Sequence, residues 1–232
     1  MKNLKLVFGI LLFTMITTGF TDAQDWANTN RYQDANAKLG LPTPGQTRIV
    51  FMGNSITELW GMTCPDFFSN REYINRGIGG QTTPQMLIRF RPDVINLKPN
   101  LVVILAGTND IAGNTGPSTL EMIRDNIISM TELARANGIK VILCSVLPAY
   151  DYPWKPRVYP AEKIFALNQM IKDYADKNGI IYLDFYSAMV DERKGLKAEY
   201  THPEDGVHPN EAGYRVMAPL TEAAITKALI RK

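Results

Sequence analysis

The sequence has few cysteines, few histidines and little net charge. Two cysteines in 232 residues exclude a disulfide-dense scaffold, and 17 glycines with 14 prolines are too few for a collagen-like chain. The formal net charge is only +2, from 25 Lys+Arg against 23 Asp+Glu, so we expect no nucleic-acid partner, which would require a concentrated basic face. Any imidazole chemistry depends on His202 or His208.

A hydrophobic run long enough to cross a bilayer is also missing. The apolar run from Leu6 to Ile16 follows Lys2 and Lys5 and is well short of the roughly 20 residues that a spanning helix needs. This pattern, followed by small residues near Ala23, is typical of a secretory signal peptide. We therefore expect a signal peptide at 1–23, export to the periplasm or the extracellular medium, and no stable membrane anchor.

Export would place the two cysteines, Cys64 and Cys144, in an oxidising compartment, where they could pair. Cys144, however, ends an apolar run, as expected for a buried small hydrophobic residue. The sequence favours free thiols and leaves a disulfide as the alternative.

What the chain does contain is a regular alternation of apolar and amphipathic runs. Short runs rich in Val, Ile and Leu predict five strands buried on both faces, at 48–52, 72–75, 101–106, 140–146 and 180–184. Helical patterns lie between them, the clearest at 118–138, at 160–177 and from 209 to near the C-terminus. This alternation predicts an α/β fold with a parallel sheet covered on both sides, in one domain at 48–232 after a lead-in segment at 24–47 that includes a short helix.

The helix predicted at 118–138 has the most complete signals. Ser118 and Glu121 have the spacing of a capping box at its start, and Gly138 is a typical stop. The apolar residues between them recur at helical spacing and predict a buried face made of Leu120, Ile123, Ile127 and Ala134.

Chemically suggestive segments follow the first three predicted strands, at the sheet edge where α/β proteins bind ligands. The segment 53–57, Gly-Asn-Ser-Ile-Thr, places Ser55 at a strand-to-helix turn, which suits a nucleophile or a plain helix cap. The glycine-rich segment 75–82 lets backbone amides approach an oxyanion or a phosphate, although Thr82 stands where a dinucleotide fingerprint needs its third glycine. The segment 107–110 offers the Asn109 amide as a donor, or forms a turn.

A fourth segment, Asp205-Gly206-Val207-His208-Pro209, precedes the last helix. A carboxylate three residues before a histidine can bind one ring nitrogen and leave the other to accept a proton. His202, Asp205 and His208 also have a regular spacing that a metal could use, but no further His or Cys cluster supports a metal site. We expect no metal, and a loop position without a catalytic role for His202.

In this order, the four segments resemble the conserved blocks of the SGNH hydrolases, the GDSL esterase/lipase family, over residues 48–229. The resemblance implies a three-layer, flavodoxin-like α/β/α sandwich with a five-stranded parallel sheet, and a serine hydrolase without a cofactor. It also implies Ser55 as nucleophile, His208 as base and Asp205 as the residue that orients it, with oxyanion donors from Ser55, Gly80 and Asn109. Asn54 departs from the family, which usually has aspartate there.

Aromatic residues near the predicted ligand side suggest a substrate surface. Trp60, Tyr150, Tyr152 and Trp154 could stack on a sugar or line an acyl groove, or simply hold a long loop in place. Exported members of the resembled family with one compact domain are often similar to carbohydrate O-acetylesterases, so we expect an O-acetyl glycan or another small ester as substrate. The alternatives are a lysophospholipase, a thioesterase or a platelet-activating-factor acetylhydrolase-like enzyme and, in a different class, a flavodoxin-like binding protein. The sequence indicates no oligomeric state.

Overall fold

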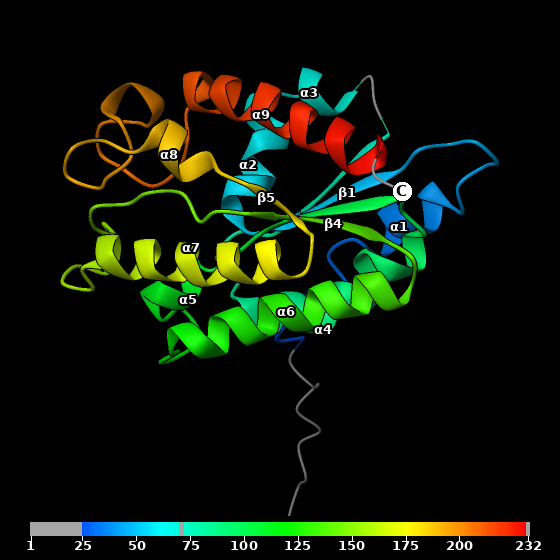
Figure 1. Cartoon of the computed structure of the whole chain (residues 1–232), viewed down its shortest axis with the longest axis horizontal. Coiled ribbons are helices and arrows are strands. Elements are labelled where there is room, and N and C mark those ends of the chain that lie inside the picture. Colours follow the sequence, from blue (N-terminus) through cyan, green and yellow to red (C-terminus); the bar gives the residue numbers. More distant parts are fainter. Residues whose placement is uncertain (1–24, 70–71, 231–232) are drawn as a thin grey trace, which may run out of the picture.

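A five-stranded, all-parallel sheet forms the centre of the computed structural model, which describes residues 25–69 and 72–230 (Figure 1). The predicted signal peptide at 1–23 lies outside the described residues. The sheet order is β2-β1-β3-β4-β5. Its strands are β1 (Ile49–Gly53), β2 (Tyr73–Gly77), β3 (Leu101–Leu105), β4 (Lys140–Cys144) and β5 (Ile181–Leu183). All five predicted strands are confirmed, with no end shifted by more than two residues.

Helices cover both faces of this sheet (Figure 1). One face packs against α4 (Thr83–Asp93), α6 (Leu120–Ala136) and α7 (Pro160–Lys177). The other packs against α2 (Ser55–Thr63), α8 (Phe185–Met189) and α9 (Glu211–Ile230). Successive strand residues point to opposite faces, so that Val50 and Met52 join the first core while Ile49 and Phe51 join the second. The predicted three-layer α/β/α sandwich is confirmed.

Shorter elements connect these layers. They are α1 (Gln33–Leu39), α3 (Asp66–Ser69), η1 (Ile95–Leu97), α5 (Thr108–Ala112) and η2 (Ala198–Tyr200). No helix in the described part of the chain is long and apolar enough to cross a membrane. Cys64 and Cys144 are both free thiols, and Cys144 is buried in β4 as predicted.

The start of α6 differs from the prediction. Its cap is Thr119, whose hydroxyl accepts a hydrogen bond from the Met122 N–H at 3.2 Å, so Ser118 lies outside the helix. Thr119 has the extended backbone typical of a cap, which places its oxygen over the first turn. The predicted stop is correct, because Gly138 has φ +72° just beyond the helix.

Strand register brings the chemically suggestive segments to one edge. Gly53, the last residue of β1, pairs with Gly77 of β2 on one side and with Leu105 of β3 on the other. The three segments that follow these strands therefore emerge side by side.

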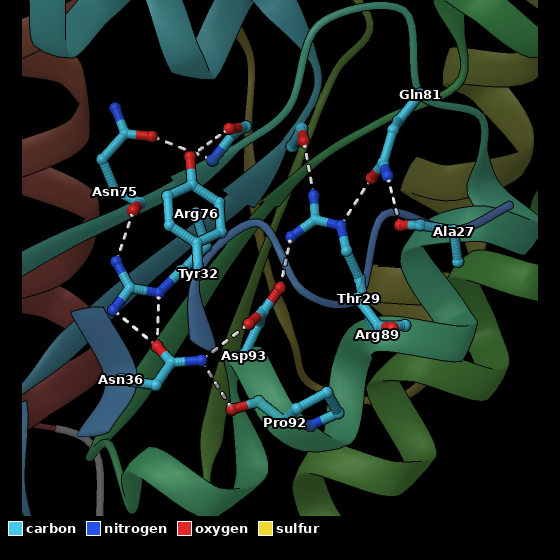
Figure 2. A network of polar contacts seen from close by, with 12 residues as sticks. Ala27, Thr29, Tyr32, Asn36, Asn75, Arg76, Gln81, Arg89, Pro92 and Asp93 are labelled. Atoms are coloured by element: carbon cyan, nitrogen blue, oxygen red, sulfur yellow. Dashed lines mark hydrogen bonds and ion pairs between the residues drawn. The ribbon is translucent and has the colours of Figure 1, made fainter. Parts of the chain in front are cut away.

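The lead-in segment packs on this edge through polar contacts (Figure 2). The Asn36 side-chain oxygen accepts from Arg76 Nε at 2.9 Å and Nη2 at 2.7 Å, and its side-chain NH2 group donates to Asp93 Oδ1 at 2.8 Å. The Tyr32 hydroxyl donates to the Gly77 carbonyl, and the Arg76 guanidinium lies 4.6 Å from the Tyr32 ring centroid. Residues before β1 thus help to fix the loop that follows β2.

Candidate active site

Ser55 is the first residue of α2, directly after the turn that ends β1. The turn is tight at Gly53, where a Cβ atom would come within 2.0 Å of the Thr57 hydroxyl. Asn54 caps the helix, because its side-chain oxygen accepts from the Ile56 N–H at 3.0 Å. Asparagine, which stands where the resembled family usually has aspartate, therefore preserves the cap.

The Ser55 hydroxyl, the His208 ring and the Asp205 carboxylate form a continuous relay. Ser55 Oγ lies 2.8 Å from His208 Nε2, and His208 Nδ1 lies 2.9 Å from Asp205 Oδ2. A carboxylate can only accept, so Nδ1 carries the proton and Nε2 is left to accept from the serine. The sequence placed the serine 153 residues away from the histidine, and the fold brings the two side chains into hydrogen-bond contact.

Asp205 is itself held by the loop before α9. Its Oδ1 accepts from the backbone N–H groups of Val207 and His208, both at 3.0 Å. Helix α9 begins at Glu211, two residues later than predicted, because Thr201 and Pro209 form a β-bridge before it. His202 is exposed in the same loop, where its carbonyl accepts from the Asp205 N–H. Within residues 25–69 and 72–230, no three His, Cys, Asp or Glu side chains are grouped as metal ligands.

The glycine-rich loop after β2 faces the same edge. Gly80 has φ +74°, a conformation that favours glycine, and a Cβ atom there would meet open space. The loop is anchored by the Ile78 N–H donating to the Gly53 carbonyl at 3.1 Å and by the Gly79 N–H donating to Glu58 at 2.7 Å. The Gly80 amide is thus carried on a loop tied to the Ser55 turn and its helix.

Asn109 and Asp110 fasten the third segment to this loop. Asn109 Nδ2 donates to the Gln81 carbonyl at 2.9 Å, which uses one of its two N–H bonds. Asp110 accepts from the Thr83 N–H at 2.9 Å and from its hydroxyl at 2.6 Å. Asp110 is buried, and this burial raises the pKa of its carboxyl to about 6, despite the opposing effect of the bonds from Thr83.

The predicted substrate aromatics divide into buried and exposed residues. The prediction for Trp60 is wrong, because its ring is 2% exposed and stacks in the core on Phe67 and Tyr214. Tyr152 is also fully buried, with its hydroxyl 2.8 Å from Thr108 Oγ1, so it lies beneath the surface that a substrate would touch.

Tyr150 and Trp154 are exposed, as a binding role requires. The Trp154 ring centroid lies 6.1 Å from that of His208, whereas the Tyr150 ring lies under the Arg193 guanidinium. Of the four predicted aromatics, Trp154 thus lies next to the relay.

Sequence reasoning missed two features of this region. One is Trp26 in the lead-in segment, which lines a cleft of about 650 Å³ together with Gly80 and Trp154. The other is Arg89 on α4, which is completely buried and binds Gln81. A lone tryptophan in a polar segment gives no sequence signal, and a charged residue on a helix is normally interpreted as solvent-exposed.

Comparisons with known proteins concern the family and the fold of the chain. Residues 51–216 match the GDSL-like Lipase/Acylhydrolase family. The structure is similar to the crystal structure of a GDSL-like lipase from Bacteroides thetaiotaomicron, with 52% sequence identity and a TM-score of 0.84 over 87% of this chain and 98% of that one.

Two curated relatives are more distant. An acetylxylan esterase of Xylanibacter ruminicola is 26% identical over 224 residues, which cover 80% of this chain and 45% of the relative. Platelet-activating factor acetylhydrolase IB subunit alpha2 of Rattus norvegicus is 29% identical over 156 residues, which cover 65% of this chain and 64% of the relative. The chain thus spans less than two thirds of the length of these curated relatives.

Proposed function

The chain belongs to the GDSL-like lipase/acylhydrolase family, and from this premise we propose that it is a serine esterase that transfers an acyl group from an O-acyl ester to water. The observation that carries the proposal is the unbroken contact from Ser55 Oγ through the His208 ring to Asp205. An alcohol is a weak nucleophile unless an adjacent base removes its proton, and in the proposal His208 is that base.

In the proposed mechanism, Ser55 Oγ attacks the ester carbonyl while its proton passes to His208 Nε2. The carbonyl oxygen becomes an oxyanion that accepts from the Ser55 and Gly80 backbone amides and from Asn109 Nδ2. When the intermediate collapses, the ester C–O bond breaks and the leaving alkoxide takes the proton from Nε2. A water molecule then attacks the acyl-serine with His208 again as base, which releases the carboxylic acid and restores Ser55.

Asp205 has two roles in this mechanism. Its bonds to Nδ1 hold the tautomer in which Nε2 can accept, and its negative charge stabilises the imidazolium that forms in the transition state. Its bonds to the Val207 and His208 amides keep the carboxylate in place while the ring changes charge.

We propose an O-acetylated carbohydrate as substrate. Similarity to the acetylxylan esterase supports this class, and so does the cleft beside Gly80, which is lined by amide and charged side chains. A platelet-activating-factor acetylhydrolase-like activity is the second candidate, favoured by the 29% identity to that relative. The predicted export would bring the enzyme into contact with extracellular glycans.

The test compares wild type with Ser55→Ala, using Ser129→Ala on α6 as the matched control. Wild type and the control should hydrolyse 4-nitrophenyl acetate and release acetate from acetylated oligosaccharides, whereas Ser55→Ala should lose both activities. Full activity in Ser55→Ala would refute the proposal that Ser55 is the nucleophile. A preference for octanoate over acetate would favour a lysophospholipase or thioesterase, and acetate release only from an acetylated phospholipid would favour the second candidate.

A further inference from the structure

Two exposed tryptophans lie on the cleft that begins at Gly80. Trp26 comes from the lead-in segment and is 47% exposed, and Trp154 comes from the loop between β4 and α7 and is 44% exposed. Isolated hydrophobic residues are common on protein surfaces, but two indoles lining one cleft near a reactive serine form a surface that a ligand can cover.

Dedicated contacts hold the Trp154 ring and the backbone at Trp26 in place. The Trp154 ring stacks on Tyr152 with centroids 5.1 Å apart, and Tyr152 is anchored through Thr108. The Trp26 carbonyl accepts from Gln85 Nε2 at 2.7 Å, and the next carbonyl, that of Ala27, accepts from Gln81 Nε2 at 2.6 Å. Surfaces fixed before binding lose little conformational entropy when a ligand arrives.

The chemistry of the cleft favours a sugar over an acyl chain. Among the described residues that line it, Ile78 is the one aliphatic side chain, whereas Asn28 and Asn114 carry exposed amide groups. Flat aromatic faces combined with amides suit a pyranose ring, which has apolar C–H faces and a rim of hydroxyls. A long acyl chain would need a continuous apolar wall.

We propose that this cleft binds a pyranose ring of an O-acetylated carbohydrate through Trp26 and Trp154, with the acetyl ester directed toward Ser55. The inference rests on the proposed esterase function and specifies where the alcohol part of the ester, the sugar, is bound. Trp154 lies beside His208, so a sugar held there places its alcohol oxygen near the base that returns the proton.

Trp26→Ala tests the subsite, with Phe165→Ala as the control because Phe165 is similarly exposed, at 45%, and lies on α7 outside the residues lining the cleft. The substrates are 4-nitrophenyl acetate and a panel of acetylated xylo-, manno- and gluco-oligosaccharides. Loss of one stacking surface should lower kcat/KM for the oligosaccharides about tenfold, leave the aryl ester within about twofold, and be largely rescued in Trp26→Phe.

Each other outcome has a distinct meaning. Wild type without activity on any ester refutes the proposed function itself. Wild type that cleaves the aryl ester but no acetylated oligosaccharide refutes the sugar subsite and the carbohydrate substrate, and leaves the esterase function standing. Equal loss on both substrates, or no loss in Trp26→Ala, also overturns the subsite.

A second inference concerns the buried Arg89 (Figure 2). Its Nε donates to the Gln81 side-chain oxygen, its Nη1 lies 3.0 Å from Asp93, and its Nη2 donates to the Gly53 carbonyl at 3.0 Å. Gly53 is two residues before Ser55, and Gln81 directly follows Gly80 and accepts from Asn109 through its backbone carbonyl. One guanidinium thus joins the nucleophile turn to the loop that carries the Gly80 amide, one of the proposed oxyanion donors.

This arrangement is costly for the fold. A fully buried ion pair is often no better for stability than apolar residues of similar volume, because both charges lose their hydration. The planar guanidinium, however, offers donors in fixed directions, which a lysine cannot reproduce. We infer that Arg89 is a positioning residue that sets the distance between Ser55 and the Gly80 amide.

The experiment compares Arg89→Lys with Arg48→Lys. Arg48 is an equally buried guanidinium at the opposite end of β1, where its Nη1 donates to the Gly40 and Leu97 carbonyls. Arg89→Lys should lower kcat for 4-nitrophenyl acetate about 10- to 100-fold with KM within about twofold, because small displacements of reacting groups are costly. Arg48→Lys should lower Tm but leave kcat within about twofold.

If Arg89→Lys does not fold, Gln81→Met provides the same test, since it removes the Gln81 amide and keeps the Arg89–Asp93 pair. A kcat loss in Arg48→Lys equal to that in Arg89→Lys would mean that any buried arginine matters equally and would overturn the positioning role. Unchanged kcat in Gln81→Met or in a folded Arg89→Lys would also overturn it.

Discussion

Asp205→Asn replaces one carboxylate oxygen by an NH2 group at the end of the contact from Ser55 through His208 to Asp205. In the wild type, Oδ1 accepts from two backbone N–H groups, while both oxygens lie within 3.0 Å of His208 Nδ1. In Asp205→Asn the amide oxygen keeps the two backbone donors, and the NH2 group takes the position of Oδ2. An Nδ1–H group would then face the new NH2 group, and two donors repel each other. We therefore expect His208 to carry its proton on Nε2, where Nδ1 can accept from the amide.

The shifted proton faces Ser55, which then has no acceptor for its own proton. Loss of the correct tautomer in a serine hydrolase relay lowers kcat by about 10⁴-fold, which corresponds to roughly 5 kcal/mol of transition-state stabilisation. Because the two backbone bonds persist, we expect the Tm of Asp205→Asn to stay within a few degrees of wild type. Asp205→Ala should lose similar activity and also unfold earlier, because each lost hydrogen bond contributes about 1 kcal/mol to stability.

The assay is steady-state hydrolysis of 4-nitrophenyl acetate at saturation, with Tm measured by circular dichroism on the same samples. Asp151→Asn is the matched control, since Asp151 Oδ1 also accepts from a backbone N–H, that of Tyr152, at 2.9 Å. The control should keep kcat within about twofold. A folded Asp205→Asn that retains more than a tenth of the wild-type kcat would refute the tautomer argument.

Other expected outcomes concern the proposed oxyanion donor Asn109, the buried carboxyl of Asp110 and the two cysteine thiols. Asn109→Ala should lower kcat about 10²- to 10³-fold with little change in KM, and steady-state rates showing less than a tenfold loss would contradict its donor role. Burial raises the Asp110 pKa from 3.8 to about 6, so its stabilising contribution is present at low pH and is lost as pH rises between these values. In urea unfolding, Asp110→Asn should therefore gain up to roughly 3 kcal/mol relative to wild type between pH 3 and pH 7, and an unchanged difference would contradict the raised pKa. An alkylating reagent should modify Cys64 in the folded protein before Cys144, as followed by mass spectrometry, because burial shields Cys144 and raises the pKa of its thiol; equal rates would contradict this.

The strands could be predicted because buried strands in a parallel sheet have a direct sequence signal. Runs such as 101–105, Leu-Val-Val-Ile-Leu, are buried at every residue. The proposed active site could be located for a related reason, since its segments directly follow strands and aligned strand ends bring them together. Spacing alone could not provide the 2.8 Å contact between Ser55 and His208, which requires the register of the whole sheet.

Side-chain burial was harder to predict where it depends on distant partners. Trp60 follows Ile56 by four residues on α2, and both are buried, a spacing that could have assigned Trp60 to the core. Arg89 and Asp93 have the same spacing on α4 and are also buried, yet nothing local distinguishes them from an exposed ion pair. Arg89 and Asp93 can be buried because Gln81, Gly53 and Asn36 supply their hydrogen-bond partners, and these three residues lie elsewhere in the chain.

Asn54 is the position where the sequence departs from the family pattern, and the structure gives a physical reason why the departure is tolerated. Its side chain is 1% exposed, and its oxygen accepts from the Ile56 N–H at the start of α2. An aspartate offers the same oxygen but adds a charge that would lose its hydration in this buried turn. The cap needs only the acceptor, and asparagine and aspartate cap helices about equally well. The residue at this position therefore fixes the turn that presents Ser55 through the geometry of one oxygen atom, and the loss of the carboxylate charge leaves that geometry intact.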